Sequence, residues 1–400
     1  MDVLCLMGLF PNGYEDEIVK NSLFGTQNAA NKLQWGIVKG LDAQPGVTVR
    51  ICNSLYIGSY PRRYKKLLIP TFPFQHREGS KDMNVGFLNL TGIKYISRYW
   101  SCRAFINKWE QENTNQEKTL IVYALTMPFT NLAGYVRRKY PDIKVCVVVP
   151  DLPEYMNTSA MGKNGIYSKA KRLSIKWIKR SLRHIDHYVL LTDQMKEWFE
   201  RPIKYTVVEG TAQASDDGMS ETREKTILYA GGIKREYGVI DLAEAFARID
   251  APEWQLVIYG DGSDLGELRE LAQNDKRIKL MGSVPNKTVV AHQRKASLLV
   301  NPRKNQEFTK YSFPSKILEY MSSGTPMLAY KLAGVPDEYD SYYYQIPTKE
   351  NGMEDALRSA MLLSDNERNT MGASARAFVR DGKSPEIQCK KIIALLNQDA

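Results

Sequence analysis

The sequence predicts an α/β protein made of two doubly wound, Rossmann-like domains that face each other across a cleft. Short apolar runs of strand length alternate with segments of helical spacing from residue 3 to residue 208. A polar stretch without periodicity follows at 211–224, and the alternation then starts again. Such repeated alternation is typical of parallel sheets with helices on both faces. The 400 residues also exceed what one hydrophobic core usually supports.

In the first half, the apolar runs at 120–125 and 143–149 are continuous, as in strands buried on both faces of a parallel sheet. Further strands are expected at 3–7, 47–52, 188–191 and 204–208. Helical spacing predicts helices at 23–41, 97–110 and 166–184. These elements define an N-terminal domain over residues 1–210, followed by a linker at 211–224.

The second half, residues 225–383, repeats the pattern. Strands are expected at 227–230, 256–259, 278–281, 298–300 and 327–329, with helices at 239–249, 264–273 and 287–296. A further helix is predicted to begin at Pro314, which suits a first helical position, and to end at Gly324, which suits a left-handed cap. Residues 384–397 have the spacing of a last amphipathic helix.

Charged residues are unevenly distributed between the two halves of the chain. Residues 1–200 carry 28 Lys/Arg against 17 Asp/Glu, a net charge of +11, whereas residues 201–400 carry 27 against 28, a net charge of −1. A basic first half indicates an anionic partner, such as acidic lipid, a phosphate-bearing substrate or nucleic acid.

Targeting and metal signals are missing from the sequence. It has no apolar run of 18 residues and no secretory leader, so a cytoplasmic location is expected. The five cysteines are scattered without paired spacing, and the four histidines form no ligand motif. This pattern fits reduced thiols and argues against a metal site.

The segment 311–326 is the first candidate site. The free N–H groups at the start of its helix would bind an anion, and Lys316 adds positive charge there. Glu319 lies about one turn further on, where it can hold a sugar hydroxyl. An ordinary capped surface helix remains the alternative.

Three glycine-bearing turns and one arginine follow strands in the second half. Gly231 and Gly232 would let the backbone approach a diphosphate, with Lys234 or Arg235 to neutralise it. Gly260 and Gly262 form a second turn, and Gly282–Pro285 a third. Arg303 follows the strand at 298–300 directly, where a bidentate phosphate contact is expected. Plain tight turns and a surface arginine remain the alternatives.

In this order, the motifs resemble the nucleotide-binding half of the family 4 glycosyltransferases, retaining enzymes of the GT-B fold, and most closely a sub-branch with an SFPSK turn. The resemblance covers roughly residues 226–345. It implies that the turn at Gly231 and the helix at Ser312 bracket a nucleoside diphosphate. It also implies that Glu319 binds the ribose, that Val284 contacts the base, and that residues 384–400 cross back to the first domain.

The chain departs from the commonest family pattern at Tyr311, where many members have a glutamate, and at Gly232 and Tyr237, where many have basic residues. The diphosphate contacts would then come from Lys234, Arg235, Arg303 or Lys316. The predicted donor-binding residues are Gly231, Gly232, Lys234, Arg235, Gly260, Gly262, Val284, Tyr311, Ser312, Phe313, Pro314, Ser315 and Glu319.

The first half is expected to hold the acceptor. Two segments that should reach the carboxyl edge of its sheet provide the acceptor residues Asn12, Gly13, Asn21 and Gly25. Asp151 follows the strand at 143–149, at the carboxyl edge of the sheet, and is interpreted as orienting the acceptor or acting as a weak base, which places it with Lys316 and Arg303 in the catalytic set. Surface loops and a helix-capping aspartate are the alternatives.

The helix at 166–184 is basic and amphipathic. Ile166, Ala170, Leu173, Trp177 and Leu182 fall near one face, which suits an anionic membrane surface, and the basic, apolar segment 62–73 would enter the same interface. A helix packed on the core with a solvated basic face is the alternative. The predicted membrane residues are Lys169, Lys171, Arg172, Lys176, Trp177, Lys179 and Arg180.

Together these patterns predict a retaining glycosyltransferase that takes a sugar from a nucleotide sugar, with UDP favoured, and passes it to a lipid-linked glycan acceptor at the inner membrane face. No cofactor or metal is expected, because no Asp-x-Asp motif is present. Three rivals are a nucleotide-sugar epimerase, which needs acid and base groups at the sugar, a non-enzymatic binder of anionic lipid, and a nucleic-acid binder, for which no motif appears. A dehydrogenase is disfavoured because no G-x-G-x-x-G follows the first strand.

Overall fold

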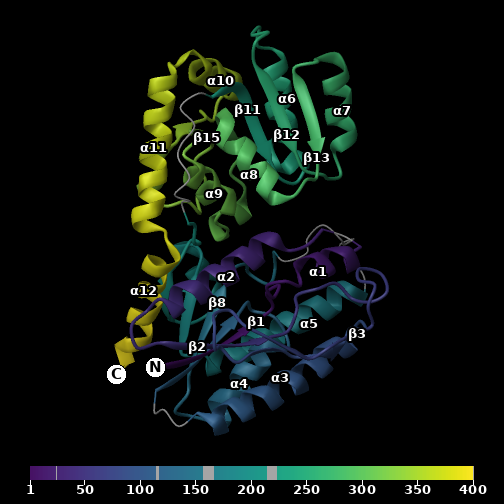
Figure 1. The fold of residues 1–400 in the computed structure, drawn as a ribbon, viewed down its shortest axis with the longest axis vertical. Coiled ribbons are helices and arrows are strands. Elements are labelled where there is room, and N and C mark those ends of the chain that lie inside the picture. Colours follow the sequence, from purple (N-terminus) through teal and green to yellow (C-terminus); the bar gives the residue numbers. More distant parts are fainter. Residues whose placement is uncertain (24, 114–116, 156–165, 214–222, 400) are drawn as a thin grey trace. The chain divides into compact units, whose positions relative to one another are not determined.

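The computed structural model describes residues 1–399 except for 24, 114–116, 156–165 and 214–222. The chain divides into two compact units (Figure 1). Unit 1 comprises Met1–Thr211 and Pro385–Ala400, and unit 2 comprises Ala212–Ser384. Most of the predicted linker at 211–224 lies outside the described residues.

Unit 1 is built on an eight-stranded sheet in the order β10-β9-β8-β7-β1-β2-β5-β4, in which only β4 runs antiparallel to its neighbour. Its central strand, β1, is buried along its whole length, as the continuous apolar pattern indicates for a doubly covered sheet. The strands are β1 (Asp2–Met7), β2 (Thr48–Asn53), β4 (Phe72–Phe74), β5 (Asp82–Asn84), β7 (Lys118–Tyr123), β8 (Lys144–Val149), β9 (His187–Leu190) and β10 (Lys204–Val207).

Helices cover both faces of this sheet. On one face, α2 (Asn28–Asp42) and α12 (Pro385–Leu396) pack against every second side chain of β1, beginning with Val3. They approach so closely that a Cβ on Gly40 would lie 2.1 Å from the Pro385 carbonyl oxygen. On the other face, α3 (Ile93–Glu112), α4 (Phe129–Lys139) and α5 (Ile166–Ser181) lie side by side in that order (Figure 1).

Several elements of unit 1 were not expected from the sequence. The helix expected at 23–41 begins at Asn28, and a separate helix α1 (Glu15–Asn21) precedes it. Helix α4, most of whose residues from Phe129 to Val136 are buried, was also not expected. Strands β3 (Leu68–Ile69) and β6 (Phe87–Leu88), which pair with each other, are too short for any period to be visible.

Unit 2 contains a six-stranded, fully parallel sheet in the order β13-β12-β11-β14-β15-β16. In chain order this is 3-2-1-4-5-6, the arrangement of dinucleotide-binding sheets, in which the direction of winding reverses between the first and fourth strands. A crevice at the carboxyl edge is expected at this reversal, between β11 and β14. The strands are β11 (Glu224–Ala230), β12 (Gln255–Tyr259), β13 (Ile278–Gly282), β14 (Ala296–Asn301), β15 (Met327–Ala329) and β16 (Tyr344–Gln345).

The helices of unit 2 are α6 (Val239–Ala247), α7 (Leu265–Asn274), α8 (Asn286–Lys295), α9 (Ser315–Ser323), α10 (Gly352–Leu362) and α11 (Asp365–Gly382). Helix α9 ends at Gly324, whose φ of 74° is left-handed, as predicted. It begins one residue later than expected, since Pro314 has an extended ψ of 109° and is the N-cap.

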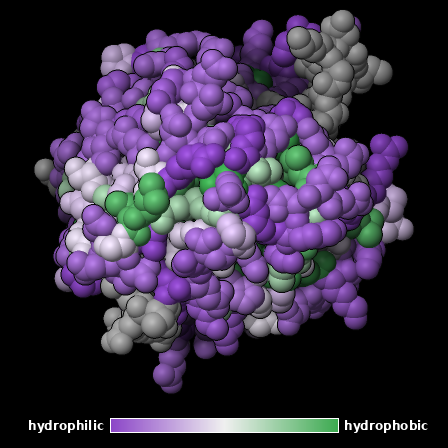
Figure 2. All heavy atoms as spheres, turned by 90° about the horizontal axis from the view of Figure 1, so that it is seen from above, coloured by the Kyte–Doolittle hydropathy of each residue, from purple (hydrophilic) through white to green (hydrophobic). Residues whose placement is uncertain are grey.

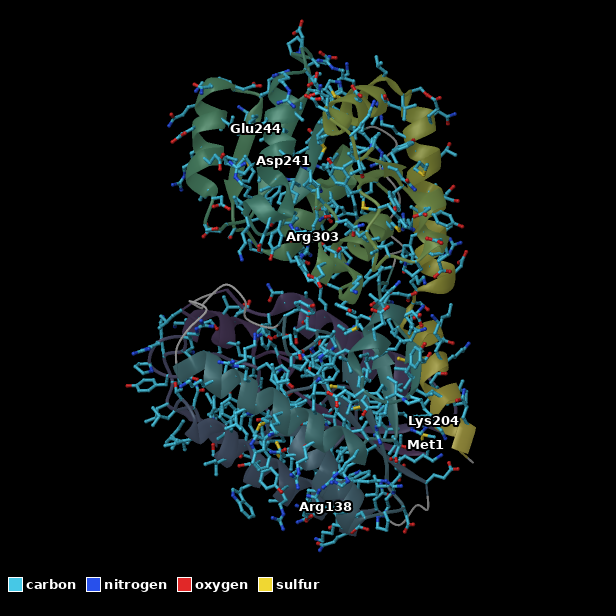
Figure 3. The ribbon with its side chains drawn as sticks, turned by 180° about the vertical axis from the view of Figure 1, so that it is seen from behind. Met1, Arg138, Lys204, Asp241, Glu244 and Arg303 are labelled. Carbon is cyan, nitrogen blue, oxygen red and sulfur yellow. The ribbon has the colours of Figure 1, made fainter. Side chains whose placement is uncertain are left out.

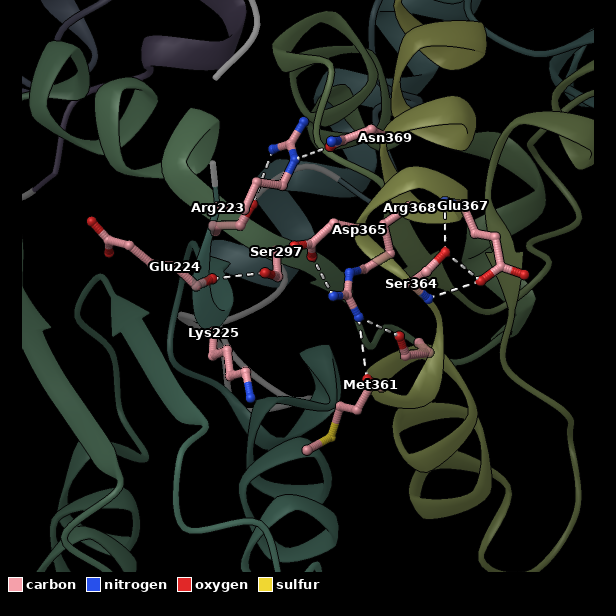
Figure 4. Close-up of polar contacts among 12 residues, drawn as sticks. Arg223, Glu224, Lys225, Ser297, Met361, Ser364, Asp365, Glu367, Arg368 and Asn369 are labelled. Carbon is pink, nitrogen blue, oxygen red and sulfur yellow. Dashed lines mark hydrogen bonds and ion pairs between the residues drawn. The ribbon is translucent and has the colours of Figure 1, made fainter. Parts of the chain in front are cut away.

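A network of polar contacts holds α9 and α11 to the amino end of β11 (Figure 4). The guanidinium of Arg223 donates hydrogen bonds to Asn369 Oδ1, to Thr325 Oγ1 at 2.7 Å and to the Gly324 carbonyl at 2.7 Å. A capping box between Ser364 and Glu367 starts α11 beside it. These contacts fix the C-terminal end of α9, so that its N-terminal end points towards the opposite, carboxyl edge of the sheet.

Candidate functional site

The candidate site of unit 2 lies where β11 and β14 end, at the reversal of strand order. Gly231 follows β11, and Arg303 follows β14 after one intervening proline. Figure 3 shows Arg303 at one end of unit 2, away from the Asp241 and Glu244 labels on α6. Both sequence-predicted segments therefore reach the edge at which parallel sheets bind ligands.

Glycines allow the loops at this edge to pack against one another. A Cβ on Gly260, which has a φ of +131°, would lie 1.8 Å from the Gly231 carbonyl oxygen, and a Cβ on Gly262 would lie 2.0 Å from that of Ile233. Gly238 approaches the Pro302 carbonyl just as closely. Gly260 and Gly262 thus position the Gly231 loop, whatever contact they make with a ligand.

Two tyrosines hold α9 against the end of β11. The hydroxyl of Tyr320 accepts a hydrogen bond from the Ala230 N–H at 3.0 Å. The hydroxyl of Tyr229 donates to the Gly232 carbonyl at 2.8 Å and accepts from Lys316 Nζ at 3.2 Å. The Lys316 ammonium also lies 4.4 Å from the centre of the Tyr229 ring. A Cβ on Gly231 would be 1.7 Å from that ammonium, so a side chain at this position would displace the Lys316 ammonium from the loop.

The electrostatics of the site favour an anion. The pKa of Lys316 is lowered to about 8, first by burial; the carboxylate of Glu319 opposes this shift and the positive charge of Arg303 adds to it. The Arg303 guanidinium lies 5.0 Å from the Tyr237 ring centre and 4.8 Å from that of Phe308. A diphosphate bound beside the N-terminus of α9 would relieve the repulsion between Lys316 and Arg303.

Glu319 is oriented by a residue that the sequence analysis did not single out. Gln293, fully buried on α8, donates from Nε2 to Glu319 Oε1 at 3.0 Å. The Gln293 carbonyl in turn accepts from Thr325 Oγ1 at 2.7 Å. A glutamine within a helical pattern gives no signal of this role, and neither do the strand residue Tyr229 and the helix residue Tyr320.

The remaining predicted donor residues have different surroundings. Lys234 pairs with Glu236 at 3.4 Å, and Arg235 forms an ion pair with Glu267. The cations of the Gly231 turn are therefore engaged within unit 2, whereas Lys316 and Arg303 reach the site from α9 and β14.

The turn before α9 combines buried and accessible residues. Tyr311 ends a short 3-10 helix, Glu307–Tyr311, and its ring lies 4.7 Å from the Lys310 ammonium. Phe313 is buried with its ring 5.4 Å from that of Tyr339, which anchors the turn. Ser312 and Ser315 flank Phe313 and Pro314 at the start of the helix. Val284 is half-buried just beyond β13, in the loop whose Gly282 carbonyl accepts from the Gly260 N–H at 2.9 Å.

Three of the predicted acceptor residues lie in loops between β1 and α2, and the fourth, Asn21, ends α1. Asn12 and Gly13 form an exposed turn after β1, and Gly25 is exposed before α2. Asn21 ends α1, where its amide donates to the Glu17 carbonyl at 2.8 Å. Asp151 is exposed after β8. Burial, and next the charge of Asp151, raises the pKa of Tyr123 at the end of β7.

The basic helix α5 turns part of its predicted apolar face outward. Leu173 and Trp177 are 57% and 53% exposed, whereas Ile178 and Leu182 are buried. The expectation that Trp177 and Leu182 share a face was wrong, because Trp177 is exposed, whereas Leu182, which lies just beyond the end of α5 at Ser181, is buried. Lys171 donates to the Glu154 carbonyl and Lys179 pairs with Glu200, at 2.9 Å each. The exposed cations of α5 are Lys169, Arg172, Lys176 and Arg180.

Two kinds of feature are absent from the described residues. None of the helices there is both long and apolar enough to cross a bilayer. Within the same part of the chain, no three His, Cys, Asp or Glu side chains are grouped so that they could hold a metal ion.

Comparison with known families gives a match for unit 2. Residues 224–362, about a third of the chain, match the family model described as glycosyl transferases group 1. An exopolysaccharide phosphotransferase of Streptomyces coelicolor is 30% identical over 164 residues, which cover 38% of this chain and 17% of that protein. N-acetyl-alpha-D-glucosaminyl L-malate synthase of Bacillus anthracis is 25% identical over 185 residues, 44% of this chain and 45% of the synthase. The chain thus spans less than half the length of these relatives.

Solved structures match the whole chain. Sucrose-phosphate synthase from Thermosynechococcus elongatus has a TM-score of 0.65 at 15% identity, and the alignment covers 100% of this chain and 99% of the synthase. The lipopolysaccharide outer core galactosyltransferase WaaB, in its apo form, has a TM-score of 0.61 at 14% identity with both chains fully covered. The predicted α/β fold with parallel sheets is confirmed as that of the GT-B glycosyltransferases, and the group 1 domain supports a glycosyltransferase.

Proposed function

We propose that the protein is a retaining glycosyltransferase, of the family 4 type with an SFPSK turn, that transfers a hexosyl group from a nucleotide sugar. One observation carries the proposal: Gly231, the Lys316 ammonium, Arg303 and the N-terminus of α9 converge at the reversal of strand order in unit 2. A nucleoside diphosphate supplies the negative charge that this arrangement lacks. Glu319, held by Gln293, would bind the ribose hydroxyls.

The chemistry follows from charge separation. As the bond between the anomeric carbon and the diphosphate oxygen breaks, the sugar becomes cationic and the diphosphate leaves with added negative charge. The acceptor hydroxyl then bonds to the anomeric carbon, and its proton passes to the departing diphosphate. Lys316, Arg303 and the backbone donors at Gly231 and α9 would stabilise that charge without a metal ion. UDP is the favoured nucleotide, and this choice is supported by the similar protein TarM, whose structure was solved in complex with UDP.

The acceptor is proposed to be a lipid-linked glycan, in polysaccharide or glycolipid assembly. The net charge of +11 in residues 1–200 and the exposed Leu173 and Trp177 among the cations of α5 support attachment to an anionic inner membrane face. Asn12, Gly13, Asn21 and Gly25 would contact the acceptor, and Asp151 would orient its hydroxyl.

A transfer assay tests this function. Radiolabelled nucleotide sugars are incubated with the protein and a membrane extract, and label in the lipid fraction is counted. Transfer is expected from one donor, with a loss of about a hundredfold or more in Lys316→Ala and Glu319→Ala. Lys225→Ala is the matched control, since Lys225 lies at the amino end of β11 and is exposed. Full activity in both site variants would refute the assignment.

A further inference from the structure

We propose that unit 1 docks on an anionic membrane through a second surface, formed by β3 and the first turns of α3 and called here the β3–α3 surface. Isolated exposed apolar residues are ordinary, and the face in Figure 2 shows small hydrophobic groups on a mostly hydrophilic surface. On the β3–α3 surface, by contrast, large exposed apolar residues are adjacent. They are Leu67, Leu68, Leu90, Ile93, Ile96 and Trp100.

The backbone joins these residues into one patch. Leu68 pairs with Leu88 across the β3–β6 ladder, and the Leu67 carbonyl accepts from the Asn89 N–H at 2.7 Å. The chain then passes directly into α3. Ile93, Ile96 and Trp100 are spaced by three and four residues, so they share one face of that helix. Leu68, Ile96 and Trp100 are 70%, 63% and 57% exposed.

Charge identifies the partner. Residues 60–108 contain ten Lys/Arg and only two Asp/Glu, and Arg62, Arg63 and Lys65 are exposed just before β3. Exposed apolar side chains with an interfacial tryptophan and flanking cations match the boundary between anionic headgroups and acyl chains. A second copy of the chain would bring the same excess of positive charge to the interface, and the two copies would repel each other.

The location of the surface suits a lipid-linked acceptor, and this part of the inference rests on the proposed function. Because α3, α4 and α5 form one layer on the same face of the sheet, the β3–α3 surface and the exposed side of α5 can meet one membrane. The N-terminal half of α3 lies near the carboxyl edge of the sheet, where the predicted acceptor residues are found. The acceptor would therefore enter unit 1 from the surface that touches lipid.

Vesicle sedimentation of the full chain tests the surface. Vesicles of phosphatidylcholine alone are compared with vesicles containing about one third phosphatidylglycerol, enough to give an anionic surface. The variant L68S/I96S/W100S should bind the anionic vesicles at least about tenfold more weakly than the wild type. The control is Leu362→Ser. Leu362 is a large apolar residue on α10 in unit 2, outside the β3–α3 surface, and its side chain is 87% exposed. Its binding should match the wild type, and all three proteins should melt alike because the altered side chains are exposed.

Three results would overturn the proposal. One is undiminished vesicle binding by the triple variant, and another is equal binding of the wild type to neutral and anionic vesicles. The third is a wild-type dimer that becomes monomeric in the triple variant, which would assign the surface to a second copy. Sugar transfer to detergent-dispersed acceptor, measured in parallel, tests the proposed function separately, since it needs no membrane docking.

Discussion

The ammonium group of Lys316 is placed where its charge is costly until an anion binds. It lies against Gly231 and the Tyr229 ring, near the guanidinium of Arg303. Its pKa of about 8 means that it loses its proton in mildly alkaline solution. We expect nucleoside diphosphate affinity to fall as the pH rises from 7 to 9, because the protonated form binds the diphosphate.

Isothermal titration calorimetry at several pH values checks this prediction. The Lys316→Met variant should bind the diphosphate about tenfold more weakly at pH 7 and should lose the pH dependence. Lys225→Met serves as the control. An unchanged pH profile in Lys316→Met would show that another group titrates.

Gln293 should act through Glu319 and not on the ligand itself. The Gln293→Leu variant removes the donor at 3.0 Å from the carboxylate and should weaken nucleotide binding by about tenfold, as expected for a hydrogen bond to a charged group. A double-mutant cycle with Glu319→Gln measures the coupling, with the thermal melt as a check on folding. If the losses of binding free energy in the two single variants add up to the loss in the double variant, Gln293 does not position Glu319.

His76 provides a pH-dependent contribution to the stability of unit 1. Burial lowers the pKa of His76, but Asp82 at 2.7 Å and Asp42 at 3.4 Å more than reverse this effect, so the pKa is raised. A group whose pKa is raised on folding stabilises the folded state. This stabilisation is complete below the pKa of the unfolded state, about 6.5, and it is lost as the pH rises through the pKa of the folded state.

The His76→Gln variant should therefore lose more stability at pH 5.5 than at pH 8.5. Urea unfolding at the two pH values, followed by circular dichroism, measures the difference. An equal loss at both values would mean that the imidazole contributes only its neutral hydrogen bond.

Among the structural elements, the loops at the ends of β11 and β12 depend on close backbone approach. Gly260→Ala would place a methyl group 1.8 Å from the Gly231 carbonyl at a φ of +131°. We expect a loss of at least about 2 kcal/mol in the free energy of unfolding of unit 2, together with loss of nucleotide binding. Gly266→Ala, in α7 with no atom within 4 Å of the added Cβ, is the matched control and should be neutral or stabilising by up to about 1 kcal/mol. Equal stability of the two variants would contradict the packing account.

Elements with a strong apolar pattern were predictable from the sequence, and elements without one were not. β1, β7 and β8 stand in continuous apolar runs, and α9 has a proline and a left-handed glycine at its ends. Strands β3 and β6 have only two residues each, so neither shows a period. Tertiary contacts, which no local pattern records, determine where such elements lie.

At the scale of the whole molecule, the two-fold repetition of β-α alternation was enough to predict two parallel-sheet units. The candidate site was only partly predictable. Gly231, Arg303 and Lys316 were identifiable because each follows a strand or starts a helix at the carboxyl edge. The roles of Tyr229, Tyr320 and Gln293 depend on contacts between segments up to 90 residues apart, so only the fold brings them together.

Thermal unfolding of the wild type and Lys316→Met with a panel of nucleoside diphosphates tests the central claim most directly. A ligand at about a hundred times its dissociation constant should add roughly 2.7 kcal/mol to the stability of the wild type. We expect a clear shift with one base, UDP being the first to test, and a much smaller shift in Lys316→Met. No shift with any member of the panel in folded wild type, or an equal shift in the variant, would contradict a diphosphate site at Gly231 and α9.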